Sequence, residues 1–184
     1  MKKYLICLLI LALLGVFYVA SSYNTLVRLN ETADGQWAQV VTQYQRRFDL
    51  IPNIVEAVKG FSKQEQTVFG QIAEARTRYS GATTIEGKVK AASQVESSLG
   101  RLLVVAENYP DLKSSQLFGN LSTELEGSEN RISVERKRFN DTVKSYNLLV
   151  KSVPSSWVAS QFGFEERSYF EATSGAENAP KVQF

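Results

Sequence analysis

The pattern of apolar and polar positions along the chain changes character once, close to residue 22. From Tyr4 to Ala20 every residue is uncharged, and most of them are large and apolar. Beyond this run, apolar residues recur every three or four positions, which is the spacing of one buried helix face. The sequence shows no strand-like alternation. The pattern therefore predicts an all-α protein that begins with an apolar helix.

The apolar run has the length of a membrane-spanning helix, since about 17 residues are just enough to cross a hydrocarbon core about 30 Å thick. Lys2 and Lys3 precede the run, and basic residues favour the cytoplasmic side, so we expect the rest of the chain outside the cytoplasm. A cleaved signal peptide is the alternative, because Ala20 and Ser22 are small residues with the spacing of a cleavage site. The length of the run favours an uncleaved anchor over residues 1–22.

Two helices are predicted to follow the anchor within a helical domain that covers residues 23–153. The first continues from the anchor to about Leu50, with no Pro-rich or Gly-rich break before it. Pro52 suits the first turn of a helix, so a second helix is predicted to begin at Ile51–Pro52 with Asp49 as its N-cap. The predicted core positions of this second helix are Ile54, Val55, Val58, Phe61, Val68, Ile72, Ala75 and Tyr79.

Two more helices complete the predicted domain. Thr83 and Glu86 form a capping box that opens the third helix, which ends at Asn108-Tyr109-Pro110. The fourth runs from about Leu112 to Val153, with apolar residues at spacings of four and seven that indicate near-antiparallel, coiled-coil-like packing. The predicted fold is an N-terminal transmembrane helix that continues into an elongated antiparallel, up-and-down four-helix bundle.

The remaining residues, 154–184, form an aromatic C-terminal segment and a polar tail, predicted to lie outside any regular helix. An antiparallel topology brings the end of the fourth helix back to the membrane-proximal end. The aromatic side chains therefore either pack on their own bundle, lie at the membrane interface, where Trp and Tyr are favoured, or contact another copy of the chain. We take them as candidate interaction residues: Trp157, Phe162, Phe164, Tyr169 and Phe170.

Composition narrows the function classes. Two of the 21 basic residues are Lys2 and Lys3, so the remaining 19 balance the 19 acidic residues, and nucleic acid is not expected as a partner. Histidine is absent, which removes the Ser-His-Asp and Cys-His catalytic sets and the usual zinc sites. Cys7 is the only cysteine and lies within the anchor. We expect no catalytic residue, no cofactor and no metal.

The densest polar cluster consists of Arg46, Arg47 and Asp49, just before Pro52. One interpretation is a site for an anion, which would face the free amides at the start of the second helix. The other is structural, with Asp49 capping that helix and an arginine pairing with it or with a neighbouring helix. Glu129 and nearby acids are more typical of surface residues paired along a helix than of metal ligands.

Several short motifs occur in a fixed order along the chain. They are Tyr23-Asn24, Leu29-Asn30-Glu31, the run 45–55, the run 107–113, Glu129-Asn130-Arg131-Ile132, Phe139-Asn140-Asp141, Tyr146-Asn147, Phe162-Gly163-Phe164 and Tyr169-Phe170. In these motifs the chain resembles the LemA family of bacterial membrane proteins, over roughly residues 23–172. The resemblance implies an N-terminal membrane helix and an extracytoplasmic helical bundle, and it transfers no catalytic residue.

The functional expectation is a non-enzymatic scaffold or adaptor of the LemA type, anchored in the cell (inner) membrane by a single span with its N-terminus in the cytoplasm. It would act through protein contacts, either with itself as a homo-oligomer or with another envelope protein. One alternative is a binding module for a small envelope ligand, with a pocket lined by side chains such as Tyr146 and Asn147. Another is a carboxylate-based enzyme, which needs two convergent acids with perturbed pKa values.

Overall fold

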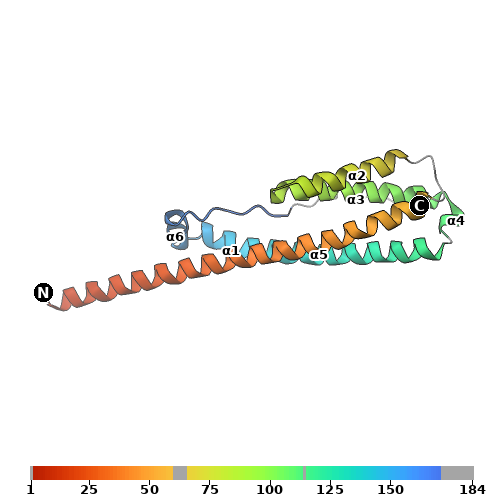
Figure 1. Cartoon of the computed structure of the whole chain (residues 1–184). Helices are drawn as coiled ribbons and strands as arrows, with labels where there is room; N and C mark the ends of the chain where they lie inside the picture. Colours follow the sequence, from red (N-terminus) through yellow and green to blue (C-terminus); the bar gives the residue numbers. More distant parts are fainter. Residues whose placement is uncertain (1, 60–65, 114, 171–184) are drawn as a thin grey trace, which may run out of the picture. The chain divides into compact units, whose positions relative to one another are not determined.

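The computed structural model describes residues 2–59, 66–113 and 115–170, and every regular element in these ranges is a helix. The prediction of an all-α protein with a long apolar N-terminal helix is therefore confirmed (Figure 1). The helices are α1 (Lys2–Lys59), α2 (Gln66–Gly81), α3 (Ile85–Glu107), α4 (Pro110–Lys113), α5 (Gln116–Lys151) and α6 (Ser155–Gln161).

The described residues form two compact units. Unit 1 contains residues 2–39 and 135–169, and unit 2 contains residues 40–134 and Phe170, as far as these are described. Helices α1 and α5 are each divided between the two units, with one segment in unit 1 and the other in unit 2. Unit 1 also holds α6, and unit 2 also holds α2, α3 and α4.

The N-terminal part of α1 has the properties of a membrane-spanning helix. It is the one helix in the described ranges that is long and apolar enough to cross a membrane, and none of its most apolar window is buried within the protein. The large side chains from Tyr4 to Tyr23 are exposed, for example 74% for Phe17. Since so much contiguous apolar surface is costly in water, the candidate span predicted from the sequence agrees with the structure.

The predicted break at Pro52 is wrong, because α1 continues through this proline to Lys59. Phe48, Ile51, Ile54 and Val58 are buried at spacings of three and four, while Pro52 lies on the exposed side. A proline inside a helix costs about 3 kcal/mol, but each large apolar side chain that is buried contributes about 1.5–3 kcal/mol. The unbroken apolar face therefore outweighs the proline.

Two consequences follow for the predicted second helix. Asp49 is not an N-cap: it lies within α1, where its Oδ1 accepts a hydrogen bond from Gln45 Nε2 at 3.0 Å. The segment between α1 and α2 falls at residues 60–65, so the predicted core position Phe61 lies outside the described residues.

The other predicted boundaries shift in detail. Helix α3 is capped by Thr84, whose Oγ1 accepts a hydrogen bond from the amide of Gly87 at 3.1 Å, so the predicted capping box at Thr83 and Glu86 is wrong. The predicted fourth helix is divided into the single turn α4 and the long α5. Trp157 was predicted outside regular structure, yet it lies in α6, because the chain makes one more short helix after Pro154.

Each unit has its own apolar core. In unit 1, Leu26 from α1 packs with Tyr146 from α5 and with Val158 and Ala159 from α6. In unit 2, α1, α2, α3 and α5 all bury apolar side chains. Its largest fully buried residues are Val40, Tyr44, Ile54, Val58, Ile72, Leu99, Leu102 and Ile132. The arrangement of the helices as a single elongated bundle stays a prediction.

Candidate functional site

The predicted cluster of Arg46, Arg47 and Asp49 is divided by the geometry of α1. Successive residues of a helix point about 100° apart, so adjacent side chains cannot share one face. Arg47 is only 7% exposed and points into unit 2, whereas Arg46 is exposed. The two arginines therefore have different roles.

Arg47 is the centre of a polar network that joins three helices of unit 2. Its Nη1 donates a hydrogen bond to Glu129 of α5 and lies 3.8 Å from Glu96 Oε1 of α3. Tyr44, one turn earlier in α1, donates its hydroxyl to the same Glu96 oxygen at 3.1 Å. Charge-assisted hydrogen bonds of this kind fix geometry as well as charge. Arg47 thus connects α1, α3 and α5 and is not a free binding group.

Arg46 and Asp49 line an open groove between α1 and α5, with a volume of about 620 Å³. On the α5 side the groove presents Glu124 and Arg131, so each wall carries one basic and one acidic side chain. This balance does not favour an anion. The free helix amides that supported an anion site are also missing here, because α1 is continuous at Asp49. The anion interpretation therefore loses its physical basis.

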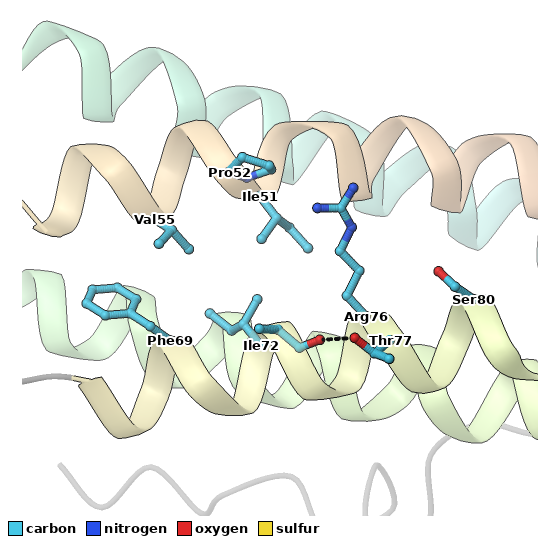
Figure 2. A pocket seen from close by; sticks show the side chains of 9 residues that line it. Ile51, Pro52, Val55, Phe69, Ile72, Arg76, Thr77 and Ser80 are labelled. Carbon is cyan, nitrogen blue, oxygen red and sulfur yellow. Dashed lines mark hydrogen bonds between the residues drawn. The ribbon is translucent and has the colours of Figure 1, made fainter.

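A second groove lies between α1 and α2, with a volume of about 510 Å³, and it is mainly apolar (Figure 2). Figure 2 shows Ile51 and Val55 of α1 directed toward Phe69 and Ile72 of α2. Arg76 rises from α2 at one end of the groove and gives that end a positive charge. The remaining lining residues are Pro52, Ala73, Thr77 and Ser80.

The C-terminal segment after α6 is held in unit 1 by polar side chains. Asn147, which is 3% exposed, donates its Nδ2 to the carbonyl of Arg167 at 2.8 Å and accepts the amide of Arg167 at 2.9 Å. The hydroxyl of Tyr146 donates to the carbonyl of Glu165 at 2.9 Å. Both side chains that were expected to line a ligand pocket therefore hold the protein's own backbone.

The side chain of Arg167 makes further contacts, with α1. Its guanidinium donates to Asn30 Oδ1 at 2.7 Å and forms an ion pair with Asp34, both of them in α1. Burial raises the pKa of Tyr146 above its ordinary value. The charge of Arg167 lowers this pKa, and the charge of Glu165 raises it, but burial has the largest effect. The phenol is therefore protonated at neutral pH and remains a donor. The role of Arg167 could not be predicted from the sequence, because the partners of its side chain in α1 lie more than 130 positions away.

The five aromatic candidates separate into two groups. Phe170 is buried and Phe164 is half-buried, whereas Trp157, Phe162 and Tyr169 are 73%, 52% and 46% exposed. Packing against the protein therefore accounts for two of the five. The other three present apolar surface outward.

Metal chemistry finds no support in the part of the chain that the structure describes. No group of three or more Cys, Asp and Glu side chains that would hold a metal ion occurs among these residues. Glu96 and Glu129 are both engaged by Arg47 instead.

Comparison with known proteins gives a consistent set of matches. The sequence model described as the LemA family matches residues 36–184. Magnetosome protein MamQ 1 of Paramagnetospirillum magneticum is 23% identical over 175 aligned residues, covering 81% of this chain and 64% of that protein. Protein LemA of Metamycoplasma hominis is 23% identical over 175 residues, covering 94% of this chain and 80% of that protein. The chain thus spans less than two thirds of the length of the MamQ relative.

Proposed function

The chain belongs to the LemA family, and on that premise we propose that it is a non-enzymatic scaffold or adaptor that acts through protein contacts. The family match and the candidate span in α1 support a membrane-associated envelope protein. Lys2 and Lys3 precede the span, which favours a cytoplasmic N-terminus and helices outside the cytoplasm. The proposed location of the span is the cell (inner) membrane.

The observation that carries this proposal is the contrast between the polar groups and the apolar groove of unit 2. Arg47, Glu96 and Glu129 are used in ion pairs that join helices. The groove between α1 and α2 instead leaves apolar side chains facing an open space, such as Val55 and Ile72. An open apolar groove between two helices is the geometry that accepts an amphipathic helix of a partner.

The end of the groove adds a charge preference. Arg76 lies in the polar part of the groove, which Thr77 and Ser80 also line, away from Phe69 (Figure 2). Thr77 donates its hydroxyl to the carbonyl of Ala73 at 2.9 Å, so this hydroxyl is already engaged. A partner helix with an acidic residue beside its apolar face would complement both parts of the groove.

The proposal is tested by mild crosslinking in cells of the tagged full-length chain, with identification of every attached protein. Val55→Arg places a charge in the groove, and Asn53→Arg places the same charge on the exposed side of the same helix as a matched control. We expect specific adducts from the parent chain and Asn53→Arg, and their loss from Val55→Arg.

The identity of the adducts distinguishes the two forms of the proposal. Adducts that contain only this chain indicate a homo-oligomeric scaffold, and a second envelope protein indicates an adaptor. Equal adducts from both variants would show that the groove is not the contact surface. Recovery of bare monomer from the parent chain would contradict the scaffold role itself.

A further inference from the structure

The segment from Ser152 to Phe164, around α6, is unusual for an exposed part of a protein because it has no charged residue. Lys151 and Glu165 flank it directly. Within it, Val153 is 72% exposed, and Trp157 and Phe162 present the outward surface described above. Leu148, one turn before the end of α5, is 64% exposed. This segment and Leu148 are called the collar below.

The collar lies beside the end of the candidate span, within unit 1. A span that begins at Tyr4 and crosses about 30 Å at 1.5 Å per residue ends near Tyr23. The ring of Phe162 lies 4.9 Å from the ring of Tyr23, and that of Phe164 lies 5.7 Å from it. The end of the collar at Phe162 and Phe164 is therefore located at the level where the span leaves the hydrocarbon layer.

A groove joins the collar directly to the span. It has a volume of about 590 Å³, and Phe162 forms its wall on the collar side. The opposite wall is formed by the span residues Ala12, Gly15, Val16, Val19 and Ala20 together with Tyr23 and Asn24. Since the span wall faces lipid in a membrane, the groove that it shares with Phe162 opens to the same lipid.

We propose that the collar is a second membrane contact of this chain, which lies in the interfacial layer of the bilayer against phospholipid. This inference rests on the membrane anchoring in the proposed function. An apolar surface that faces the interface is buried by about 5–10 Å into the boundary between headgroups and acyl chains. Trp is favoured at this depth, and Trp157 is the most exposed aromatic residue of the collar.

The hydrogen bonds of the collar suit this location, because the backbone groups that enter the acyl-chain side of the interface lose water and need partners within the protein. Ser155 donates its hydroxyl to the carbonyls of Leu149 and Ser152, at 2.7 and 2.8 Å. At the end of α6, the amides of Phe162, Gly163 and Phe164 bond to carbonyls of the helix. Gly163 has a φ of 73°, a left-handed conformation that glycine adopts without strain and that turns the chain after α6.

Phospholipid is favoured over a second copy of the chain as the occupant of this surface. The collar continues the exposed surface of the span, which already requires lipid. Its exposed side chains also include no charge that would specify a protein partner. An apolar surface without charges is buried by any apolar layer that has a polar boundary, and the bilayer interface is such a layer.

The sequence supplies its own probes, because it contains two tryptophans, Trp37 and Trp157. The full-length chain is reconstituted in phosphatidylcholine vesicles whose acyl chains carry bromine near the headgroup. Trp37→Phe leaves Trp157 as the single emitter, and Trp157→Phe leaves Trp37. Trp37 is the matched control, because it lies 14 residues beyond Tyr23, about 21 Å farther along α1.

We expect brominated lipid to remove about half of the emission of Trp157 and to leave that of Trp37 nearly unchanged, because only the collar reaches the interfacial layer. Emission of Trp157 that is quenched by aqueous acrylamide but not by brominated lipid would overturn the proposal. Protection from both quenchers would overturn it as well and would indicate a protein contact. A chain that does not float with the vesicles would contradict the anchoring itself, whereas a chain that floats without quenching contradicts the collar alone.

Discussion

Units 1 and 2 use polar side chains in different ways. In unit 1, Asn147, Tyr146 and Arg167 hold a C-terminal segment that has no regular secondary structure. In unit 2, Arg47 and its two acidic partners connect helices whose backbone amides and carbonyls are already hydrogen-bonded within each helix. The first use supplies missing backbone partners, and the second fixes the positions of neighbouring helices.

This difference follows from where backbone groups find hydrogen bonds. Helices pair their own amides and carbonyls, so the polar side chains of unit 2 are not needed for backbone pairing and can connect neighbouring helices instead. An extended segment that is packed against helices has no such pairing, so side chains must replace it. Removal of a polar side chain should therefore separate helices in unit 2 but release a segment in unit 1.

The largest effect is expected from Arg47→Ala. This substitution removes the guanidinium that faces Glu96 and Glu129, whose side chains are 19% and 44% exposed. We expect the free energy of unfolding to fall by about 3 kcal/mol. Urea unfolding of the full chain in detergent measures the change. Arg46→Ala, at the exposed neighbouring position, should change it by less than about 0.5 kcal/mol. Equal effects at both positions would remove the contrast between the two arginines.

The next effect concerns Asn147→Ala, which leaves the amide and the carbonyl of Arg167 without their partner. We expect the free energy of unfolding to fall by about 2 kcal/mol, because both groups are partly buried and lose their partner. Limited trypsin digestion should then cleave at Arg167 much faster, while cleavage within unit 2 stays slow. Uniformly faster digestion of both units would show that Asn147 supports the whole fold.

Tyr44 and Tyr79, whose rings lie 5.6 Å apart in unit 2, form a matched pair. Tyr44→Phe loses the hydrogen bond to Glu96 and should cost about 1 kcal/mol. Tyr79→Phe should leave the free energy of unfolding unchanged or raise it, because the buried hydroxyl of Tyr79 has no hydrogen-bond partner among the described residues.

Tyr79 also predicts a dependence of stability on pH. Burial raises the pKa of Tyr79 from 10.0 to about 12, so the folded state holds this proton more tightly than the unfolded state. The resulting stabilisation is fully present below pH 10.0 and is lost as the pH rises toward about 12. Urea unfolding between these pH values should therefore show a smaller decline for Tyr79→Phe than for the parent chain. An equal decline would contradict this assignment.

The smallest effect is expected from Lys151→Ala, which removes an exposed ion pair with Glu166 at 2.7 Å in unit 1. The carboxylate of Glu166, which accepts a hydrogen bond from Lys151, raises the pKa of that ammonium. Exposed pairs contribute little, so the free energy of unfolding should hardly change, and the change should be smaller still in high salt. Release of the C-terminal segment in this variant would show that the pair matters as much as Asn147.

The sequence predicted the helical class and most core faces because apolar spacing reports burial directly. It failed at Pro52, where a local preference for a helix start competed with an apolar face that continues through Phe48, Ile51 and Ile54. The sequence alone does not show whether the local preference of a proline or the burial of an apolar face contributes more free energy. In this protein the burial of the apolar face is larger, so the helix continues.

The partners of the polar side chains were harder to predict. Glu96 follows the buried Val95 directly, so it lies at the edge of the buried face of α3. An acidic residue at such an edge is only a weak indication that a buried basic side chain pairs with it. Asn147 and Arg167 are 20 positions apart and meet only because the chain turns back after α6. The five aromatic residues stay a predicted group of interaction candidates, and their different exposures depend on that same turn.

In the proposed function, unit 2 contacts proteins through its groove, and unit 1 contacts lipid through its collar. The most direct measurement places a photo-crosslinking amino acid in cells at Val55 of the groove in one variant and at Val153 of the collar in another. We predict discrete protein adducts from position 55 and lipid adducts without a protein partner from position 153. Protein adducts from position 153 together with none from position 55 would contradict the account.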